Sequence, residues 1–234
     1  MANGLGLKQE CAVSGEADFR KHAPATLRNR EAILAVLRGR LAPGGLVLEV
    51  ASGSGEHAAY FATGLPGMVF QPSDPHPESR ASIDAWAASA RLANLRPALA
   101  LDATAPDWKL AGVDAVLCIN MLHIAPWAAA RGLIRNSARV LGRDGLLFLY
   151  GPFKRGGAHT APSNAVFDLD LLGRDPEWGV RDLEAVAAEA EGAGFGVPEI
   201  LAMPANNLSV VFRLEGSLGA AQTRQGPSPW TSSF

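Results

Sequence analysis

The sequence of 234 residues predicts an α/β fold: a doubly wound, mostly parallel sheet of about seven strands with helices on both faces. Three observations predict it. Short apolar runs alternate with helical patterns, a glycine turn joins the first run to the next helix, and only five residues separate the last two runs. So short a link requires an antiparallel hairpin, because a parallel crossover needs about a dozen residues or more.

In the first half of the chain, apolar residues at helical spacing predict a helix over 26–41, which the proline–glycine turn at 42–45 ends. The β-rich run 46–50 follows as a buried strand and leads through a glycine turn into a helix that extends to Thr63. The alternation then continues, with expected strands at 68–71, 98–101 and 113–119 and an expected helix at 78–92.

In the second half, a proline near the first turn opens a helix over 126–141, and a strand at 146–150 follows a turn bounded by glycines. Residues 151–178 are expected to form a long irregular connection before a helix at about 180–193. The pattern closes with two β-like segments that form the hairpin, 197–202 and 208–214.

Length and composition indicate one domain. Hydrophobic residues make up 48% of the chain and charged residues 19%, as in globular proteins with a core. We expect this domain at 24–215, after a polar segment at 1–23 and before a disordered tail at 216–234, which is rich in Gly, Ser, Gln and Pro.

Charge and hydropathy exclude several classes of partner. Lys and Arg number 21 against 23 Asp and Glu, so there is no basic surplus for nucleic acid, and the basic residues within 20–40 are interpreted as a solvated helix face. No membrane span or secretory signal is visible. Cys11 and Cys118 indicate neither a disulfide framework nor a metal site. We expect a cytoplasmic protein, monomeric or homodimeric.

The turn after the first strand contains Gly53 and Gly55. Ligands of open parallel sheets bind beyond the carboxyl ends of the strands, so glycines between a strand and a helix favour a nucleotide site. A dinucleotide fingerprint would place its third glycine at Ala58. Glu49, within the strand, suits a ligand with a cationic amino-acid end, such as S-adenosylmethionine. It is otherwise a structural carboxylate that caps nearby amides.

Two further acids follow the next predicted strands. Asp74 ends the second strand, about 20 residues beyond the loop, where a carboxylate accepts hydrogen bonds from ribose hydroxyls; it is otherwise a turn residue before Pro75. Asp102 ends the third strand and is a candidate partner for the adenine amino group. Three acids at three successive strand ends favour S-adenosylmethionine over NAD, which explains Asp102 less well.

Asn120 and His123 follow the fourth strand, where the transferable methyl group is expected. His123 is a candidate general base or steers the acceptor, and it can equally hold its loop through a backbone hydrogen bond. The 151–178 segment is too long for a plain connection and is the expected lid over the acceptor. It and the residues just after it contain aromatic, polar and cationic candidates for acceptor binding.

Six segments resemble the DUF938 family, also called methyltransferase-like 26 or the UPF0585 proteins. They are LEVASGSGEHAAYFA (48–62), QPSDPHPESRASIDAW (71–86), CINMLHIAPW (118–127), YGPFKRGGAHTAPSNAVFD (150–168), DPEWGVRDLE (175–184) and MPANNLSVVF (203–212). The similarity covers about residues 20–214, and the last four segments are not general methyltransferase features. The resemblance implies a class I S-adenosylmethionine-dependent methyltransferase with a Rossmann-like fold, but it does not imply an acceptor.

The resemblance also extends the expected site. It implies that an N-terminal Arg-Asn element, Arg28 and Asn29, closes over the methionine end of the cofactor. With the flanking motif residues, the expected cofactor-binding set is Arg28, Asn29, Glu49, Ala51, Ser52, Gly53, Gly55, His57, Asp74, Pro75, Asp102, Ala103, Asn120 and Met121. The expected catalytic residues are Asn120 and His123, and the expected acceptor-binding residues are His123, Tyr150, Phe153, Asn164, Trp178 and Arg181.

We therefore expect a methyltransferase that moves the sulfonium methyl of S-adenosylmethionine to an oxygen, nitrogen or sulfur of a small or medium organic acceptor, leaving S-adenosylhomocysteine. Two alternatives stay open. The first is an S-adenosylmethionine-binding protein with non-methylating chemistry or a regulatory, partner-binding role. The second, less favoured, is an NAD(P)-dependent reductase.

Overall fold

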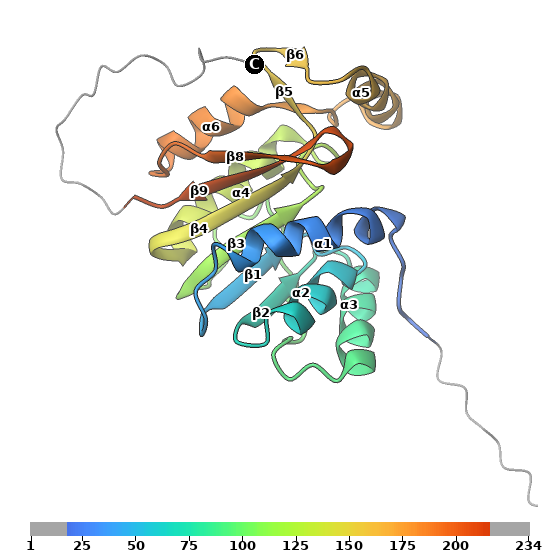
Figure 1. Ribbon diagram of the computed structural model, residues 1–234, viewed down its shortest axis with the longest axis vertical. Helices are drawn as coiled ribbons and strands as arrows, with labels where there is room; N and C mark the ends of the chain where they lie inside the picture. Colours follow the sequence, from blue (N-terminus) through green and yellow to red (C-terminus); the bar gives the residue numbers. More distant parts are fainter. Residues whose placement is uncertain (1–17, 216–234) are drawn as a thin grey trace, which may run out of the picture.

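The computed structural model describes residues 18–215, so the expected tail at 216–234 and residues 1–17 lie outside the described residues. Its central sheet has the order β2-β1-β3-β4-β9-β8 (Figure 1). The strands are β1 (Leu46–Val50), β2 (Val69–Ser73), β3 (Val113–Ile119), β4 (Leu141–Gly151), β8 (Glu199–Met203) and β9 (Asn207–Arg213). The first four run parallel, while β9 is antiparallel to both β4 and β8. The predicted Rossmann-like α/β fold with its terminal hairpin is confirmed.

The sheet has six strands, because the strand expected at 98–101 is replaced by single bridges to β2 at Leu95 and Leu99. Pro72 interrupts this ladder, since proline has no N–H to donate. The Nε2 of Gln71 donates to the carbonyl of Pro97 at 2.7 Å instead. Leu99 nevertheless donates its N–H to the carbonyl of Pro72 and accepts from the N–H of Asp74, so the chain still reaches the carboxyl edge of the sheet.

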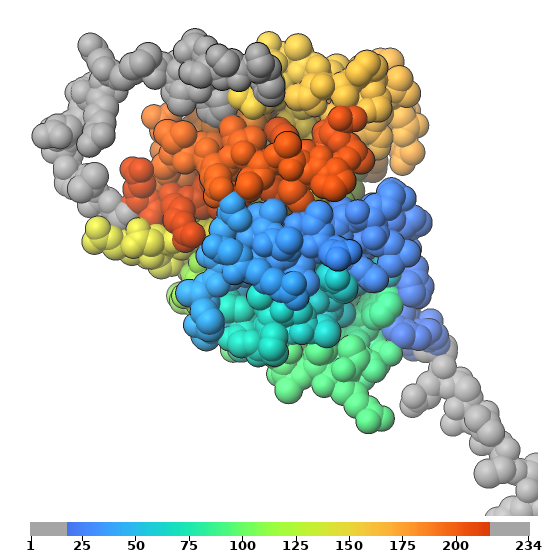
Figure 2. All heavy atoms as spheres, in the orientation of Figure 1, coloured from blue at the N-terminus to red at the C-terminus, as the bar shows by residue number. Residues whose placement is uncertain are grey.

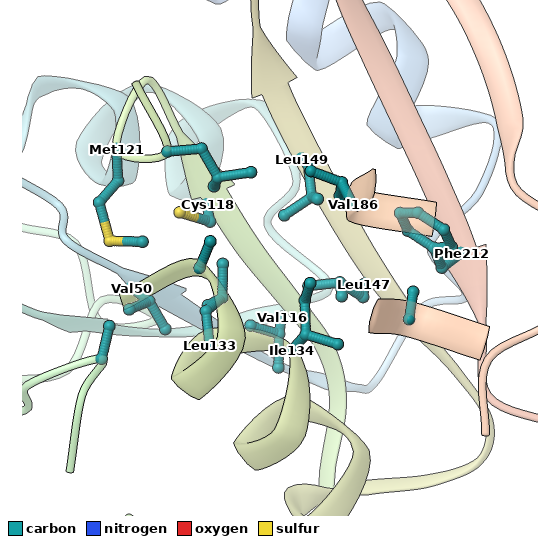
Figure 3. Close-up of a cluster of buried hydrophobic side chains, with 14 of the residues drawn as sticks. Val50, Val116, Cys118, Met121, Leu133, Ile134, Leu147, Leu149, Val186 and Phe212 are labelled. Carbon is teal, nitrogen blue, oxygen red and sulfur yellow. The ribbon is translucent and has the colours of Figure 1, made fainter. Parts of the chain in front are cut away.

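Two layers of helices cover the sheet (Figure 1). α1 (Pro24–Arg38), α2 (Glu56–Gly64) and α3 (Pro77–Ala90) pack on one face, and α4 (Trp127–Val140) and α6 (Leu183–Gly192) on the other. Successive strand residues point to opposite faces of the sheet. Val47 therefore belongs to a first cluster of buried side chains, under α1, α2 and α3, and Leu48 to a second cluster, under α4 and α6. Figure 3 shows the second cluster, in which Leu133 and Val186 from the two helices meet the strand residues.

The expectation of an irregular 151–178 segment is wrong. It contains helix α5 (Pro162–Arg174) and two strands, β5 (Phe153–Arg155) and β6 (Ala158–His159), which form a small sheet with β7 (Arg181–Asp182). The helix escapes sequence analysis because apolar residues occupy two of its faces. Leu171 is buried while Leu169 is 71% exposed, so no single apolar stripe appears.

The hairpin packs beside the N-terminal helix. Figure 2 shows the red β8–β9 hairpin lying against the blue α1. Arg40, just after α1, donates from Nε to Glu199 of β8 at 2.9 Å, and Arg213 of β9 donates to the carbonyl of Arg40. These contacts place α1 over the boundary between the parallel strands and the hairpin. Over residues 18–215, every helix is too short or too polar to cross a membrane.

Candidate functional site

The glycine loop between β1 and α2 places its two glycines in different surroundings. Gly53 and Gly55 both have left-handed backbone angles, with φ of 58° and 88°. A Cβ on Gly55 would lie 2.6 Å from the Cα of Ile83 in α3, whereas no described atom lies within 4 Å of a Cβ on Gly53. Gly55 therefore allows the loop to pack on α3, and Gly53 borders open space.

Asp74 follows β2 and braces this loop. Its carboxylate is buried and accepts hydrogen bonds from the backbone N–H groups of Gly53 and His76, each at 3.0 Å. Each carboxylate oxygen has a second lone pair, so Asp74 retains acceptor capacity for a ligand hydroxyl. The loop role and the ligand role expected for Asp74 are therefore compatible.

A cavity of about 490 Å³ opens at the carboxyl edge of the sheet. This volume is typical of small-molecule sites. Seven of the residues expected to bind the cofactor line it: Ala51, Gly53, Asp74, Pro75, Asp102, Ala103 and Met121. Asp102 is exposed, and its Oδ1 accepts from the backbone and hydroxyl of Thr104. Leu101, Ile119 and Ala129 add apolar walls.

Glu49 lies within β1 and is only 2% exposed. Burial raises its pKa from 4.5 to about 7, the charge of Asp74 adds to this rise, and a hydrogen bond with Ser52 opposes it. Its Oε2 is buried without a hydrogen-bond partner among the described residues. A buried carboxyl group with an unused acceptor is costly unless a ligand satisfies it.

A buried polar network joins four elements, and none of its residues lines the cavity. The Nε2–H of His57 in α2 donates to Oδ1 of Asn29 in α1 at 2.7 Å. Burial raises the pKa of Tyr150 in β4, and the neighbouring side chains of Asn29 and Asn207, with the charge of Arg28, oppose this rise. Burial lowers the pKa of His57 to about 4, so this imidazole is neutral at pH 7. Residues expected at the cofactor and at the acceptor thus meet in one network, which sequence spacing does not reveal.

Asn120 and His123 converge on the backbone of Gly151. A Cβ on Gly151 would lie 3.2 Å from Nδ1 of His123 and 3.9 Å from Oδ1 of Asn120. Asn120 has a left-handed φ of 61°, which turns the chain at the end of β3. His123 is 5% exposed, and burial, with a contribution from Arg181, lowers its pKa to about 4. Within residues 18–215 its ring nitrogens have no hydrogen-bond partner, and neither His123 nor Asn120 is among the residues that line the cavity.

The other residues expected to bind the acceptor have protein partners. Phe153 is 2% exposed within the hydrophobic core. Asn164 donates to Thr160 and to the carbonyl of Asn206. Arg181 donates to three backbone carbonyls, and Trp178 is half-buried.

Sequence analysis missed two buried acids near the site. Glu56, at the first position of α2, accepts from the N–H of Ala23 and from His22, and so fastens the chain before α1 to the glycine loop. Asp168 in α5 is paired with Lys154 and His159. The sequence signal that could have found Glu56 is its place at the start of a helix, and for Asp168 it is an acid within an apolar stretch.

The family model described as "Protein of unknown function (DUF938)" matches residues 20–214. Among solved structures, the fold is similar to that of the S-adenosylmethionine-dependent methyltransferase SibL in its apo form. The identity is 20% and the TM-score 0.70, over 82% of this chain and 56% of that chain.

It is also similar to an O-methyltransferase family protein from Burkholderia thailandensis, with 18% identity and a TM-score of 0.71 over 83% of this chain and 58% of that one. Human N-acetylserotonin methyltransferase in complex with SAM has 15% identity and a TM-score of 0.67, over 82% of this chain and 53% of that one. The chain therefore spans little more than half the length of these proteins, and at such identities the similarity shows the fold.

Proposed function

The chain belongs to the DUF938 family, and from this premise we propose that it is an S-adenosylmethionine-dependent methyltransferase acting on an oxygen, nitrogen or sulfur of a small or medium organic acceptor. The cavity at the carboxyl edge of the sheet carries the proposal, because the loop glycine Gly53, Asp74 and Asp102 line one space of about 490 Å³ there. The fold shared with methyltransferases supports it.

The residues present fit this cofactor. The unpartnered Oε2 of Glu49 suits the ammonium group of the methionine end, and the open space at Gly53 admits a ligand close to the backbone. Asp74 would hold the ribose hydroxyls through its remaining lone pairs, and Asp102 would accept from the adenine amino group. The apolar wall around Met121 suits the flat face of the base.

When bound, S-adenosylmethionine supplies a sulfonium methyl whose carbon–sulfur bond breaks as the acceptor's lone pair forms the new bond, leaving S-adenosylhomocysteine. The chain's contribution is alignment and exclusion of water. His123 is neutral at pH 7, since burial lowers its pKa to about 4, so it accepts a hydrogen bond from a protonated acceptor group. Asn120, facing the same point at Gly151, orients that group.

Calorimetry with S-adenosylhomocysteine and with NADH tests the cofactor. We expect S-adenosylhomocysteine to bind and Asp74→Ala to weaken its binding by about 1–3 kcal/mol, the cost of leaving a hydrogen-bonding group without its partner. Asp107→Ala is the matched control, because this acid is exposed and outside the cavity. NADH binding without S-adenosylhomocysteine binding would instead establish the reductase alternative and refute the proposal.

Transfer is tested with methyl-labelled cofactor and the small-molecule fraction of a cell extract. We expect label to enter an acceptor, and we expect His123→Ala and Asn120→Ala to lower transfer while cofactor affinity is retained. Binding of the cofactor without labelling of any acceptor would favour a regulatory or partner-binding protein.

A further inference from the structure

A cluster of charged side chains lies in the small sheet and α5, outside the cofactor cavity. The carboxylate of Asp168 is 6% exposed and accepts from Nζ of Lys154 at 2.7 Å and from Nε2 of His159 at 3.2 Å. Its Oδ1 also accepts from the N–H of Val180 at 2.6 Å. One buried acid thus joins β5, β6 and α5 to the segment before β7.

The neighbours of this carboxylate hold His123 from two sides. Phe167, adjacent to Asp168 in α5, packs edge-on against the His123 imidazole with ring centroids 5.4 Å apart. Gly179, adjacent to Val180, donates its N–H to the carbonyl of His123 at 3.0 Å. The ring of His123 therefore contacts a residue adjacent to Asp168, and its carbonyl is bonded to a residue adjacent to Val180, whose N–H Asp168 accepts.

Close packing at Gly179 makes this arrangement specific. A Cβ there would lie 3.0 Å from Oδ1 of Asp168, so a side chain would push the segment away from the carboxylate. Arg181 continues the attachment, since its guanidinium donates to the carbonyls of Leu122 and Ala125, on both sides of His123. The segment 179–181 is thus fastened to Asp168 on one side and to the His123 loop on the other.

We propose that Asp168 is a positioning residue for His123: by holding Phe167 and the 179–181 segment, it fixes the imidazole at the acceptor side of the site. The inference rests on the proposed function, because it assigns a purpose to the position of His123. Burial raises the pKa of Asp168, but hydrogen bonds from Lys154 and Val180 outweigh this and keep it below its ordinary value. The carboxylate is therefore ionised throughout the neutral range.

The test compares Asp168→Ala with Asp168→Asn, which keeps an oxygen for the Val180 N–H. Asp170→Asn is the matched control, because Asp170 is an exposed acid of the same helix that pairs with Arg174 on the surface. Two measurements are made on each full-length variant: the imidazole NMR resonances of His123, assigned with His123→Gln, and kcat and KM for methyl transfer. Affinity for S-adenosylhomocysteine reports that the fold and the cofactor cavity are intact.

We expect Asp168→Ala to shift the His123 resonances and to lower kcat by about 10- to 100-fold, as for a misplaced reacting group. Cofactor affinity should stay within about two-fold, Asp168→Asn should fall between Asp168→Ala and wild type, and Asp170→Asn should match wild type. If Asp168→Ala fails to fold, Gly179→Ala replaces it, because the added Cβ would push the 179–181 segment away from the Asp168 carboxylate. Unchanged His123 resonances in the folded variant would overturn the inference. They are measurable even if no acceptor is methylated, a failure that would count against the proposed function alone.

Discussion

Replacing Glu49 by Gln should stabilise the protein at alkaline pH while weakening cofactor binding. The carboxyl group is 2% exposed and its pKa rises from 4.5 to about 7, so the folded state binds this proton more tightly than the unfolded state. The stabilisation from Glu49 is complete below pH 4.5 and is lost as the pH rises through 7. At about 1.36 kcal/mol per pKa unit, the loss is about 3 kcal/mol.

Urea denaturation of the two proteins at pH 5 and at pH 8 measures this difference. We expect similar free energies of unfolding at pH 5 and a variant more stable by up to about 3 kcal/mol at pH 8, because the amide has no charge to bury. The other titrating groups are common to both proteins, so their contributions cancel in the difference between the two unfolding free energies. A difference in unfolding free energy that is the same at both pH values would refute the reasoning.

The same substitution tests the assignment of Glu49 to the cofactor. An ionised carboxylate that meets an ammonium group contributes about 1.5–3 kcal/mol, so Glu49→Gln should weaken S-adenosylmethionine by about 10- to 100-fold at pH 8. Wild-type affinity should fall as the pH drops below 7, and that of the variant should not. Equal affinities in calorimetry would remove Glu49 from the site.

Three further substitutions have defined outcomes. Gly55→Ala should destabilise the fold by at least about 2 kcal/mol in thermal unfolding, because its Cβ would lie 2.6 Å from the backbone of Ile83. Gly151→Ala should lower kcat with unchanged cofactor affinity, since its Cβ would lie 3.2 Å from Nδ1 of His123; unchanged kcat would contradict the site geometry. Asn29→Ala should lower the free energy of unfolding in urea by about 1–3 kcal/mol, because it leaves buried polar partners unsatisfied. Arg28→Ala, at an exposed neighbour, is the control, and an equal or smaller loss for Asn29→Ala would exclude the network.

Local pattern accounts for the parts of the fold that the sequence predicted. The strand at 46–50 is specified by its own β-rich residues and the glycine turn by the glycines that follow it. The five-residue link specifies the hairpin. Asp74 and Asp102 were placed at one edge because parallel strands end on the same side of a sheet, and both line the cavity. These conclusions need only periodicity and topology.

Other features depend on residues far apart in the chain. The strand expected at 98–101 fails at Pro72, which lies in the partner strand, and helix α5 was missed because its two apolar faces meet different surroundings. The network brings together Asn29 of α1, His57 of α2 and Tyr150 of β4. No pattern within one segment carries such information.

The sequence by itself determined the class of sheet, the glycine loop and the edge where the cavity opens, since these follow from spacing along single elements. Only the tertiary structure decided that Glu49 is buried with an unsatisfied oxygen and that His123 is buried against Phe167 with a pKa lowered to about 4. The physical reason is that burial, pKa and hydrogen-bond partners are properties of the packed environment, which several distant segments create together.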